Sequence, residues 1–291
     1  MDGTLKPQRM SYLKELKNLI HSQNSFKENS DMSPLECKCC GSVAPLLGNV
    51  DFAKTCTDRL GTAVFENTGC LVPYHKCSKC GFIFTTFADE WPENTISKMI
   101  YNEEYGKADG VMPGWEAGES DPRQTISYKN GLKLIDNLGI NGDQGLQVLD
   151  FGAGGNPGLT GMCFKDKGFD LTSYEPYLCD GAMQLKYDKY DLIYSIEVFE
   201  HVINLTNLCN FMAHHLSDRG LMFVQTLIHP HPAGEDILES WYIAPRNGHF
   251  SIFTFPAIFL LFKRVGINIV QTPMGMVGFK NKPLFKNNIF I

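Results

Sequence analysis

The chain has 291 residues, 43% of them hydrophobic, which is enough to bury one substantial core and a smaller lobe. Its net charge of −6 argues against broad nucleic-acid binding. The longest apolar stretch, residues 252–262, contains Pro256 and is too short to span a bilayer, so we expect no membrane contact. Residues 1–30 show no signal peptide, so the ten cysteines suit a reducing cytoplasm and a metal site better than disulfides.

The N-terminal 34 residues are polar. A short helix-like piece at 12–21 is followed by a linker rich in Ser and Asn. Segments of this kind at a chain end are usually poorly ordered, so we interpret residues 1–34 as a mobile tail.

Two Cys-x-x-Cys-Gly units follow the tail. The first contains Cys37 and Cys40 and the second Cys77 and Cys80, with 36 residues between Cys40 and Cys77. Each unit curls so that two thiolates face one ion, and two such units complete a tetrahedral four-sulfur Zn²⁺ site. Such a closed site is structural and helps a small lobe to fold. The alternatives are free buried thiols, a redox pair, or Cys39 as a substitute ligand, although its spacing is wrong for a knuckle.

Further along, an apolar run ends in an acid and a glycine-rich turn, reading LQVLDFGAGGNP from residue 146 to 157. The run suits a buried parallel strand, and Asp150 lies at its end, where α/β sheets bind ligands. Gly152 and Gly154 allow the backbone to turn sharply and to approach a bound molecule. Asn156 and Pro157 suit the N-cap and first residue of a helix. A dinucleotide fingerprint needs a glycine where Pro157 stands, so that fingerprint fails.

Strands and helices then alternate. The strand at 169–175 ends in Glu175, which lies 21 residues after Gly154, near where an acid accepts hydrogen bonds from ribose hydroxyls. The next strand begins at Tyr190 and closes with Glu-Val-Phe-Glu-His, from Glu197 to His201. The remaining pattern predicts a helix at 205–216 that ends at 218–220, a strand at 221–226, a helix at 254–265, a strand at 267–271, and an edge strand or surface segment at 280–291.

The Asp150-x-Gly152-x-Gly154 pattern resembles motif I of the class I S-adenosylmethionine-dependent methyltransferases. The Glu-Val-Phe-Glu-His segment is similar to the post-strand motif of the subgroup that includes the ubiquinone-pathway O-methyltransferases. The resemblance covers about residues 123 to 275 and implies an α/β fold, a Rossmann-like sheet with helices on both faces. It also implies S-adenosyl-L-methionine as cofactor, held by Asp150, Gly152, Gly154, Glu175 and Glu197.

One part of the chain departs from the family. Only 15 residues separate Glu175 from Asp191, where the family fits a helix and a third strand. The residue that contacts the adenine amine is therefore not assigned, and Asp180 and Gln184 are the nearest candidates.

A zinc-knuckle lobe before such a core resembles the ketosugar C-methyltransferases of deoxysugar pathways. Residues 100–105 resemble a family segment that folds over the cofactor, which implies a contact from Tyr105. Residues 241–251 resemble the active-site loop, which implies that His249, His201 or Tyr242 removes the substrate proton. Arg246 would pair with a phosphate or carboxylate of the substrate. The alternative is a packed loop with a structural histidine.

Four parts are therefore expected: a polar tail (1–34), a zinc-binding lobe (35–90), a linker or cofactor lid (91–122) and a methyltransferase domain (123–291). The sulfonium is already a reactive methyl donor, so the protein must hold the acceptor in line and remove a proton. We expect the acceptor to be a small polar metabolite such as a sugar or nucleotide-sugar. The alternatives are an RNA or protein methyltransferase that docks its substrate on the zinc lobe, and a non-catalytic cofactor-binding relative.

Overall fold

The computed structural model describes residues 11–20, 35–61, 63–110, 122–175, 184–230 and 237–283. Contacts divide the chain into a first unit, residues 1–113, 200–204 and 227–257, and a second unit, residues 114–199, 205–226 and 258–291. Each unit is therefore built from segments that are not continuous in sequence. Asp180 and residues 284–291, on which two of the expectations fall, lie outside the described residues.

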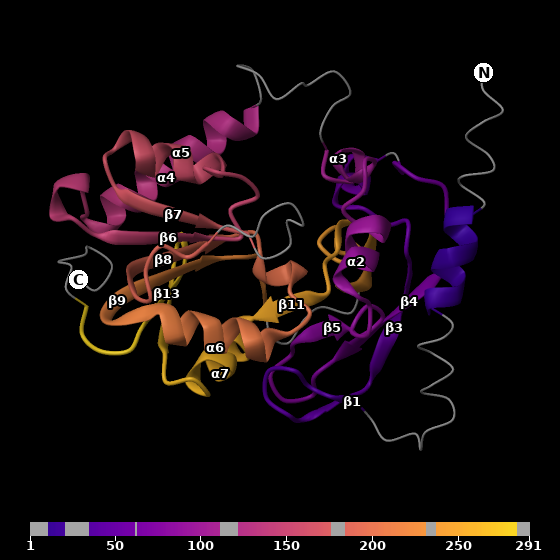
Figure 1. Cartoon of the computed structure of the whole chain (residues 1–291). Helices are drawn as coiled ribbons and strands as arrows, with labels where there is room; N and C mark the ends of the chain where they lie inside the picture. Colours follow the sequence, from indigo (N-terminus) through magenta and orange to yellow (C-terminus); the bar gives the residue numbers. More distant parts are fainter. Residues whose placement is uncertain are drawn as a thin grey trace. The chain divides into compact units, whose positions relative to one another are not determined.

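The second unit contains a six-stranded sheet (Figure 1) in the order β12-β13-β9-β8-β6-β7. Strand β6 (Gln147–Phe151) pairs in parallel with β7 (Asp170–Tyr174) on one side and with β8 (Tyr190–Ile196) on the other. β8 pairs in parallel with β9 (Leu216–Gln225). β13 (Gly275–Phe279) runs antiparallel to both β9 and β12 (Asn268–Thr272).

Helices cover both faces of this sheet (Figure 1). α4 (Pro122–Leu138) and α5 (Leu159–Asp166) lie on one face, and α6 (Leu205–His215) and α7 (Phe255–Lys263) lie on the other. Because both faces are covered, the parallel strands are almost continuously apolar, as in β8, whose residues 192–195 are all buried. The predicted α/β class with a Rossmann-like sheet is confirmed.

Two expectations about local structure in this unit were wrong, and one strand was not predicted. β9 already begins at Leu216, not at Leu221 as predicted. Its pairing with β8 shifts between Leu216 and Leu221. Residues 218–220, predicted to end the helix, therefore form an irregularity inside the strand. α5 has Gly158 as its N-cap, two residues later than predicted. A Cβ at position 158 would lie 2.1 Å from the carbonyl oxygen of Ala153, so the chain must pass the glycine turn before the helix can start. β13 was not predicted, because two of its five residues are glycine.

The first unit contains a five-stranded sheet in the order β10-β11-β5-β4-β3. Its strands are β3 (Leu46–Asp51), β4 (Leu71–Lys76), β5 (Ile83–Thr85), β10 (Ile228–His229) and β11 (Ser251–Thr254), and a separate hairpin joins β1 (Leu35–Glu36) to β2 (Val43–Ala44). Its α-helices include α2 (Glu93–Met99) and α3 (Tyr105–Ala108). Short 3₁₀ turns in the chain are η1 (Cys56–Leu60), η2 (Gly142–Gln144), η3 (Phe199–His201), η4 (Ile237–Glu239) and η5 (Pro245–Asn247).

Residues 11–20 form a helix rather than a mobile segment. Leu16 and Ile20 lie one helical turn apart and are buried in the core of the first unit. The hydroxyl of Tyr12 donates a hydrogen bond of 2.9 Å to the carbonyl oxygen of Met99. The expectation of a mobile tail was therefore wrong for these residues, because an apolar helix face packs against the rest of the unit. None of the helices in the described ranges has the length and apolarity needed to cross a membrane.

Candidate functional site

The glycine turn after β6 is fastened to the end of β7. The amide nitrogens of Gly152 and Ala153 donate to the carbonyl oxygen of Tyr174 at 2.8 and 3.2 Å. Gly152 and Gly154 have φ angles of 77° and 62°, which favour glycine. A Cβ at Gly152 would also lie 2.4 Å from Cγ2 of Val198. Both glycines are therefore required by the backbone path, as the sequence pattern predicted.

Glu175 follows β7 directly and lies beside this turn. Its Oε2 accepts a hydrogen bond of 3.1 Å from the amide nitrogen of Gly154. The acid and the glycines predicted for the cofactor are thus brought together at the carboxyl ends of β6 and β7. β7 and β8 lie on opposite sides of β6, so the strand order reverses here, which is where open α/β sheets bind ligands.

Asp150 lies beneath the turn and is only 5% exposed. Its Oδ2 would lie about 3 Å from a Cβ placed at Gly158 or Gly161, so it is enclosed by glycines. Burial raises the pKa of Asp150 to about 7; the nearby hydroxyl of Tyr194 lowers it and the charge of Glu175 raises it further. A buried acid of this kind shapes the turn from within and is not open to solvent.

Glu197 follows β8 at the same edge of the sheet. It is exposed and has a φ of 53°, an uncommon conformation for a residue other than glycine. Its amide nitrogen donates to the carbonyl oxygen of Gln225 at 2.8 Å, which ties it to the end of β9. Backbone strain of this kind often occurs at functional sites. Gln184, one candidate for the adenine contact, is exposed, and residues 184–189 contain no strand.

The four knuckle cysteines of the first unit converge. The sulfur atoms of Cys37, Cys40, Cys77 and Cys80 lie within 4.8 Å of one another. Each knuckle is closed by an amide-to-carbonyl hydrogen bond, from Gly41 to Cys37 at 2.8 Å and from Gly81 to Cys77 at 3.1 Å. Cys39 is buried but is not part of the cluster.

The thiol chemistry of this cluster fits a cation. Hydrogen bonds from Cys39 and Cys80 lower the pKa of the Cys37 thiol, whereas the hydrogen bond with Cys37 and burial raise the pKa of Cys80. Zn²⁺ would stabilise four thiolates at once. Four convergent sulfurs are the donor set of a structural zinc site.

A second side-chain cluster of the first unit contains both histidines that the sequence singled out. Ligand-type atoms of Glu200, His201 and His249 lie within 4.8 Å of one another. The ring centroids of His201 and His249 are 4.9 Å apart, and Nε2 of His201 lies 3.8 Å from Oε1 of Glu200. Burial lowers the pKa of His201 to about 4 and that of His249 to about 3, so both rings are neutral near pH 7.

The two histidines differ in exposure. The His201 side chain is 17% exposed, and its Nδ1 lies 3.2 Å from the hydroxyl of Tyr101. His249 is only 5% exposed, and its Nδ1 lies 2.7 Å from the carbonyl oxygen of Tyr242. The hydroxyl of Tyr242 is itself buried and accepts a hydrogen bond from the amide nitrogen of Leu227 at 3.2 Å. His201 is thus the most accessible of the three predicted bases.

Arg246 is held inside the first unit. Its two terminal nitrogens donate to the carbonyl oxygen of Ile100 at 2.7 Å and to Oδ1 of Asn102 at 2.8 Å. The side chain is buried, and its guanidinium lies 5.2 Å from the ring centre of Phe65. These contacts correct the expectation that Arg246 pairs with a substrate anion: it fixes the segment at 100–102 instead.

Tyr105 begins α3 and stacks edge-on against Tyr101, with ring centroids 5.0 Å apart. Burial raises the pKa of Tyr105 well above its ordinary value. Tyr101 was not predicted as a site residue, whereas Glu200 belongs to the Glu-Val-Phe-Glu-His segment that the sequence pattern pointed to. Cys56 lies beside His249, and a separation of 193 residues gives no sequence signal for that contact.

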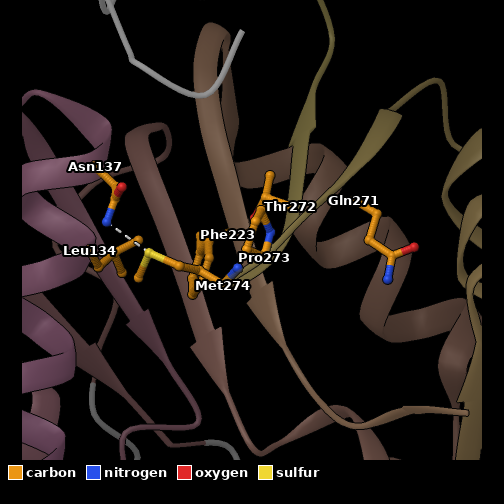
Figure 2. A pocket seen from close by; sticks show the side chains of 7 residues that line it. All are labelled: Leu134, Asn137, Phe223, Gln271, Thr272, Pro273 and Met274. Carbon is orange, nitrogen blue, oxygen red and sulfur yellow. Dashed lines mark hydrogen bonds between the residues drawn. The ribbon is translucent and has the colours of Figure 1, made fainter. Parts of the chain in front are cut away.

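The second unit also contains a cavity of about 300 Å³ (Figure 2). It lies between α4 and the turn from β12 to β13, where Asn137 Nδ2 contacts Met274 Sδ at 2.8 Å. Its lining, which includes Leu134 and Phe223, carries no titratable side chain. The cavity therefore has room for a small molecule but no side chain that could act as an acid or a base.

Comparison with known proteins defines the class. Residues 124–272, just over half of the chain, match the model of the methyltransferase domain family. The chain belongs to this family. The search of curated proteins found no match.

Several solved structures are similar at low identity. A candidate sarcosine dimethylglycine methyltransferase from Galdieria sulphuraria is 17% identical, with 52% of this chain and 63% of that chain covered and a TM-score of 0.38. A candidate O-methyltransferase from Nostoc punctiforme is 16% identical (61% and 59% covered, TM-score 0.39). The mitomycin 7-O-methyltransferase MmcR is 11% identical (66% and 62% covered, TM-score 0.43). This chain thus spans less than two thirds of the length of each, and similarities this weak carry no information about its substrate.

Proposed function

We propose that the protein transfers the methyl group of S-adenosylmethionine to a small polar metabolite, such as a sugar or nucleotide-sugar. The observation that carries the cofactor part is the hydrogen bond from Gly154 to Glu175. It places a carboxylate beside a glycine turn at the point where the strand order reverses, as a ribose-binding acid requires. Asp150, Gly152 and Glu197 would shape and line the same site, and Tyr105 stays a proposed cofactor contact on the resemblance of its segment alone.

The acceptor would lose its proton to the Glu200–His201–His249 cluster. His201 is our choice of base because it is neutral near pH 7 and the most exposed of the three predicted groups. Tyr101 would hold its ring through Nδ1, and His249 and Tyr242 would support it from within the unit. Since the sulfonium needs no activation, holding the acceptor in line and taking its proton is sufficient chemistry.

The net charge supports a small acceptor over RNA. A charge of −6 disfavours the counterion release that drives RNA binding. We assign the four-cysteine cluster to a structural Zn²⁺ ion, since four sulfur ligands leave no open position for chemistry. The free cysteines suit a reducing compartment such as the cytoplasm.

Calorimetric titration with S-adenosylmethionine, and separately with NAD, tests the cofactor assignment. Glu175→Gln removes one charge and should weaken S-adenosylmethionine binding by about 10- to 100-fold, the value of a charged hydrogen bond. Asp218→Asn, an exposed acid of the same unit, is the matched control and should bind normally. Equal affinities in the two variants would remove Glu175 from the site, and binding of NAD alone would overturn the proposal.

The acceptor is tested by transfer of radioactive methyl to pooled sugars and nucleotide-sugars, with total RNA and protein as competing substrates. Incorporation into the small-molecule pool, lost in His201→Gln, is the expected result. Incorporation into RNA or protein alone would replace this substrate class with the macromolecular one.

A further inference from the structure

Arg246 holds both sequence neighbours of Tyr101. Its two terminal nitrogens donate to the carbonyl oxygen of Ile100 at 2.7 Å and to Oδ1 of Asn102 at 2.8 Å. The arginine is 4% exposed, and Ile100 is fully buried. Because a guanidinium presents its donors in a rigid fork, the two hydrogen bonds fix the path of the backbone on either side of Tyr101.

The turn that contains Arg246 ends at Gly248, which lies against the same tyrosine. Gly248 is the C-cap of η5 and has a φ of 80°. A Cβ at this position would lie 3.0 Å from the hydroxyl oxygen of Tyr101 and 3.5 Å from Nδ1 of His201. Glycine allows both this backbone angle and the close approach. The turn and Tyr101 therefore both contact the ring that we propose as the base.

His201 lies between the turn and Tyr101. Its Nδ1 is 3.2 Å from the hydroxyl oxygen of Tyr101. Burial lowers the pKa of His201 to about 4, and hydrogen bonds with the backbone of Asn247 and Gly248 oppose this shift. A hydrogen bond that raises the pKa of a histidine is one that the ring donates. Because Gly248 faces Nδ1, that nitrogen carries the proton, and Nε2 keeps the lone pair that a base needs.

We propose that Arg246 is a positioning residue for His201: it holds Tyr101 and the turn at 245–248 together, and so fixes the ring with Nδ1 protonated and Nε2 bare. This inference rests on the proposed function, because it assigns a supporting residue to the proposed base. All the groups involved lie in the first unit. A misplacement of about 1 Å can lower the rate of an enzyme about 100-fold, so a residue without substrate contact can matter for turnover.

The first experiment identifies the tautomer of His201 by long-range ¹H–¹⁵N NMR of the full-length protein with ¹⁵N-labelled histidine at pH 7. The His201 signals are those lost in His201→Gln. In the wild type, Nδ1 should have the chemical shift of a protonated nitrogen and Nε2 that of a bare one. In Arg246→Lys the two shifts should move toward each other, as in a ring that exchanges between tautomers.

The control for this experiment is Arg219→Lys, at an exposed position of the second unit, which should keep the wild-type shifts. Wild-type shifts retained in Arg246→Lys would overturn the proposal. So would a wild-type ring that already exchanges between tautomers.

A matched pair of variants at Asn102 covers the case in which Arg246→Lys does not fold. Oδ1 of Asn102 accepts from Arg246 and from the amide nitrogen of Glu104 at 3.1 Å. Asn102→Asp keeps this acceptor and should keep the wild-type shifts, whereas Asn102→Ala removes it and should move them. Both variants lose the hydrogen bond that Nδ2 donates to the carbonyl oxygen of Lys98, so that loss cancels in the comparison. Identical shifts in the two variants would overturn the proposal.

Kinetics separates this inference from the proposed function. Where methyl transfer is measured, Arg246→Lys and Asn102→Ala should lower kcat by about 10- to 100-fold with KM nearly unchanged, and Asn102→Asp should not. A raised KM with an unchanged kcat would overturn the positioning role. If the wild type transfers no methyl group, the proposed function fails, whereas the NMR comparison still decides whether Arg246 fixes the ring.

Discussion

The glycine turn of the second unit and the histidine cluster of the first unit are built in different ways. The turn is made mainly of backbone: its glycines have positive φ, and its hydrogen bonds run between strand ends that follow one another in the chain. The histidine cluster is made of the side chains of residues 200, 201 and 249, which only folding brings together. The first kind of site can be recognised from a local pattern, whereas the second needs the tertiary structure.

The two regions also respond differently to burial. In the turn, burial raises the pKa of an acid, Asp150, to about 7. In the cluster, burial lowers the pKa values of two bases to about 4 and about 3. Each region therefore favours neutral side chains near pH 7, but the two respond to acid in opposite directions. Variants that act on one unit alone can separate them.

Loss of the four-cysteine site should have the largest effect. Structural Zn²⁺ binds small domains with about 10–16 kcal/mol of apparent free energy, so Cys80→Ser or chelation should unfold the first unit and leave the second folded. Limited proteolysis with mass spectrometry should then find new cuts within residues 35–110. Cys70→Ser, a buried thiol outside the cluster, is the control and should remain protected. Continued protection of residues 35–110 after chelation would contradict a structural metal.

The next largest effect should be that of pH, which changes the stability of the two units in opposite directions. His201 and His249 ordinarily titrate near 6.5, so between that value and about 4 the unfolded chain binds more protons. Their contribution to the stability of the first unit is full above pH 6.5 and is lost as pH falls, by up to about 1.4 kcal/mol per pH unit for each ring. Asp150 acts in the opposite sense: its contribution is full below pH 3.8 and is lost as pH rises through 7.

Hydrogen exchange resolved by segment, from pH 7 to pH 5, measures how the free energy of unfolding of each unit changes with pH. His201→Gln and His249→Gln should flatten the slope of the first unit only, and Asp150→Asn that of the second only. A slope in the first unit that persists in the double histidine variant would mean that other groups set it.

The glycine turn can be tested with a matched pair of variants. In Gly154→Ala the added Cβ meets no atom within 4 Å. The free energy of unfolding should therefore fall only by the cost of a left-handed backbone at alanine, about 1–2 kcal/mol. Gly152→Ala adds a collision with Val198 at 2.4 Å and should cost roughly 2 kcal/mol more. Denaturant unfolding followed in the second unit compares the two. Equal costs would show that Val198 moves aside without penalty.

A smaller effect than that of Gly152→Ala is expected at Arg246. Arg246→Lys replaces two fixed donor nitrogens with one ammonium that cannot occupy both positions, so the first unit should lose about 1–3 kcal/mol. Arg219→Lys, an exposed arginine of the second unit, is the control and should change little. If Arg246→Lys instead left the stability unchanged and raised KM, Arg246 would be a substrate-binding residue.

Parts of the fold could be predicted because the signal is local. The strands β6, β7 and β8 are short apolar runs followed by an acid or a glycine. Most of their predicted ends lie within one residue of the ends in the structure. The knuckles were recognisable because ligand spacing and the following glycine are fixed by the turn itself. Element boundaries failed where neighbours decide them, as at Leu216, whose strand start depends on pairing with Tyr190.

The sequence by itself determined the class of sheet, the glycine turn with its two acids, and the pairing of two cysteine knuckles, since each depends on covalent neighbours or on strand order. Only the tertiary structure decided that Arg246 binds its own chain, that residues 11–20 are packed, and that Cys56 lies beside His249. The physical reason is distance along the chain. A contact between residues 193 positions apart leaves no periodicity or spacing in the sequence, and burial, which sets the pKa values of the histidines, exists only after folding.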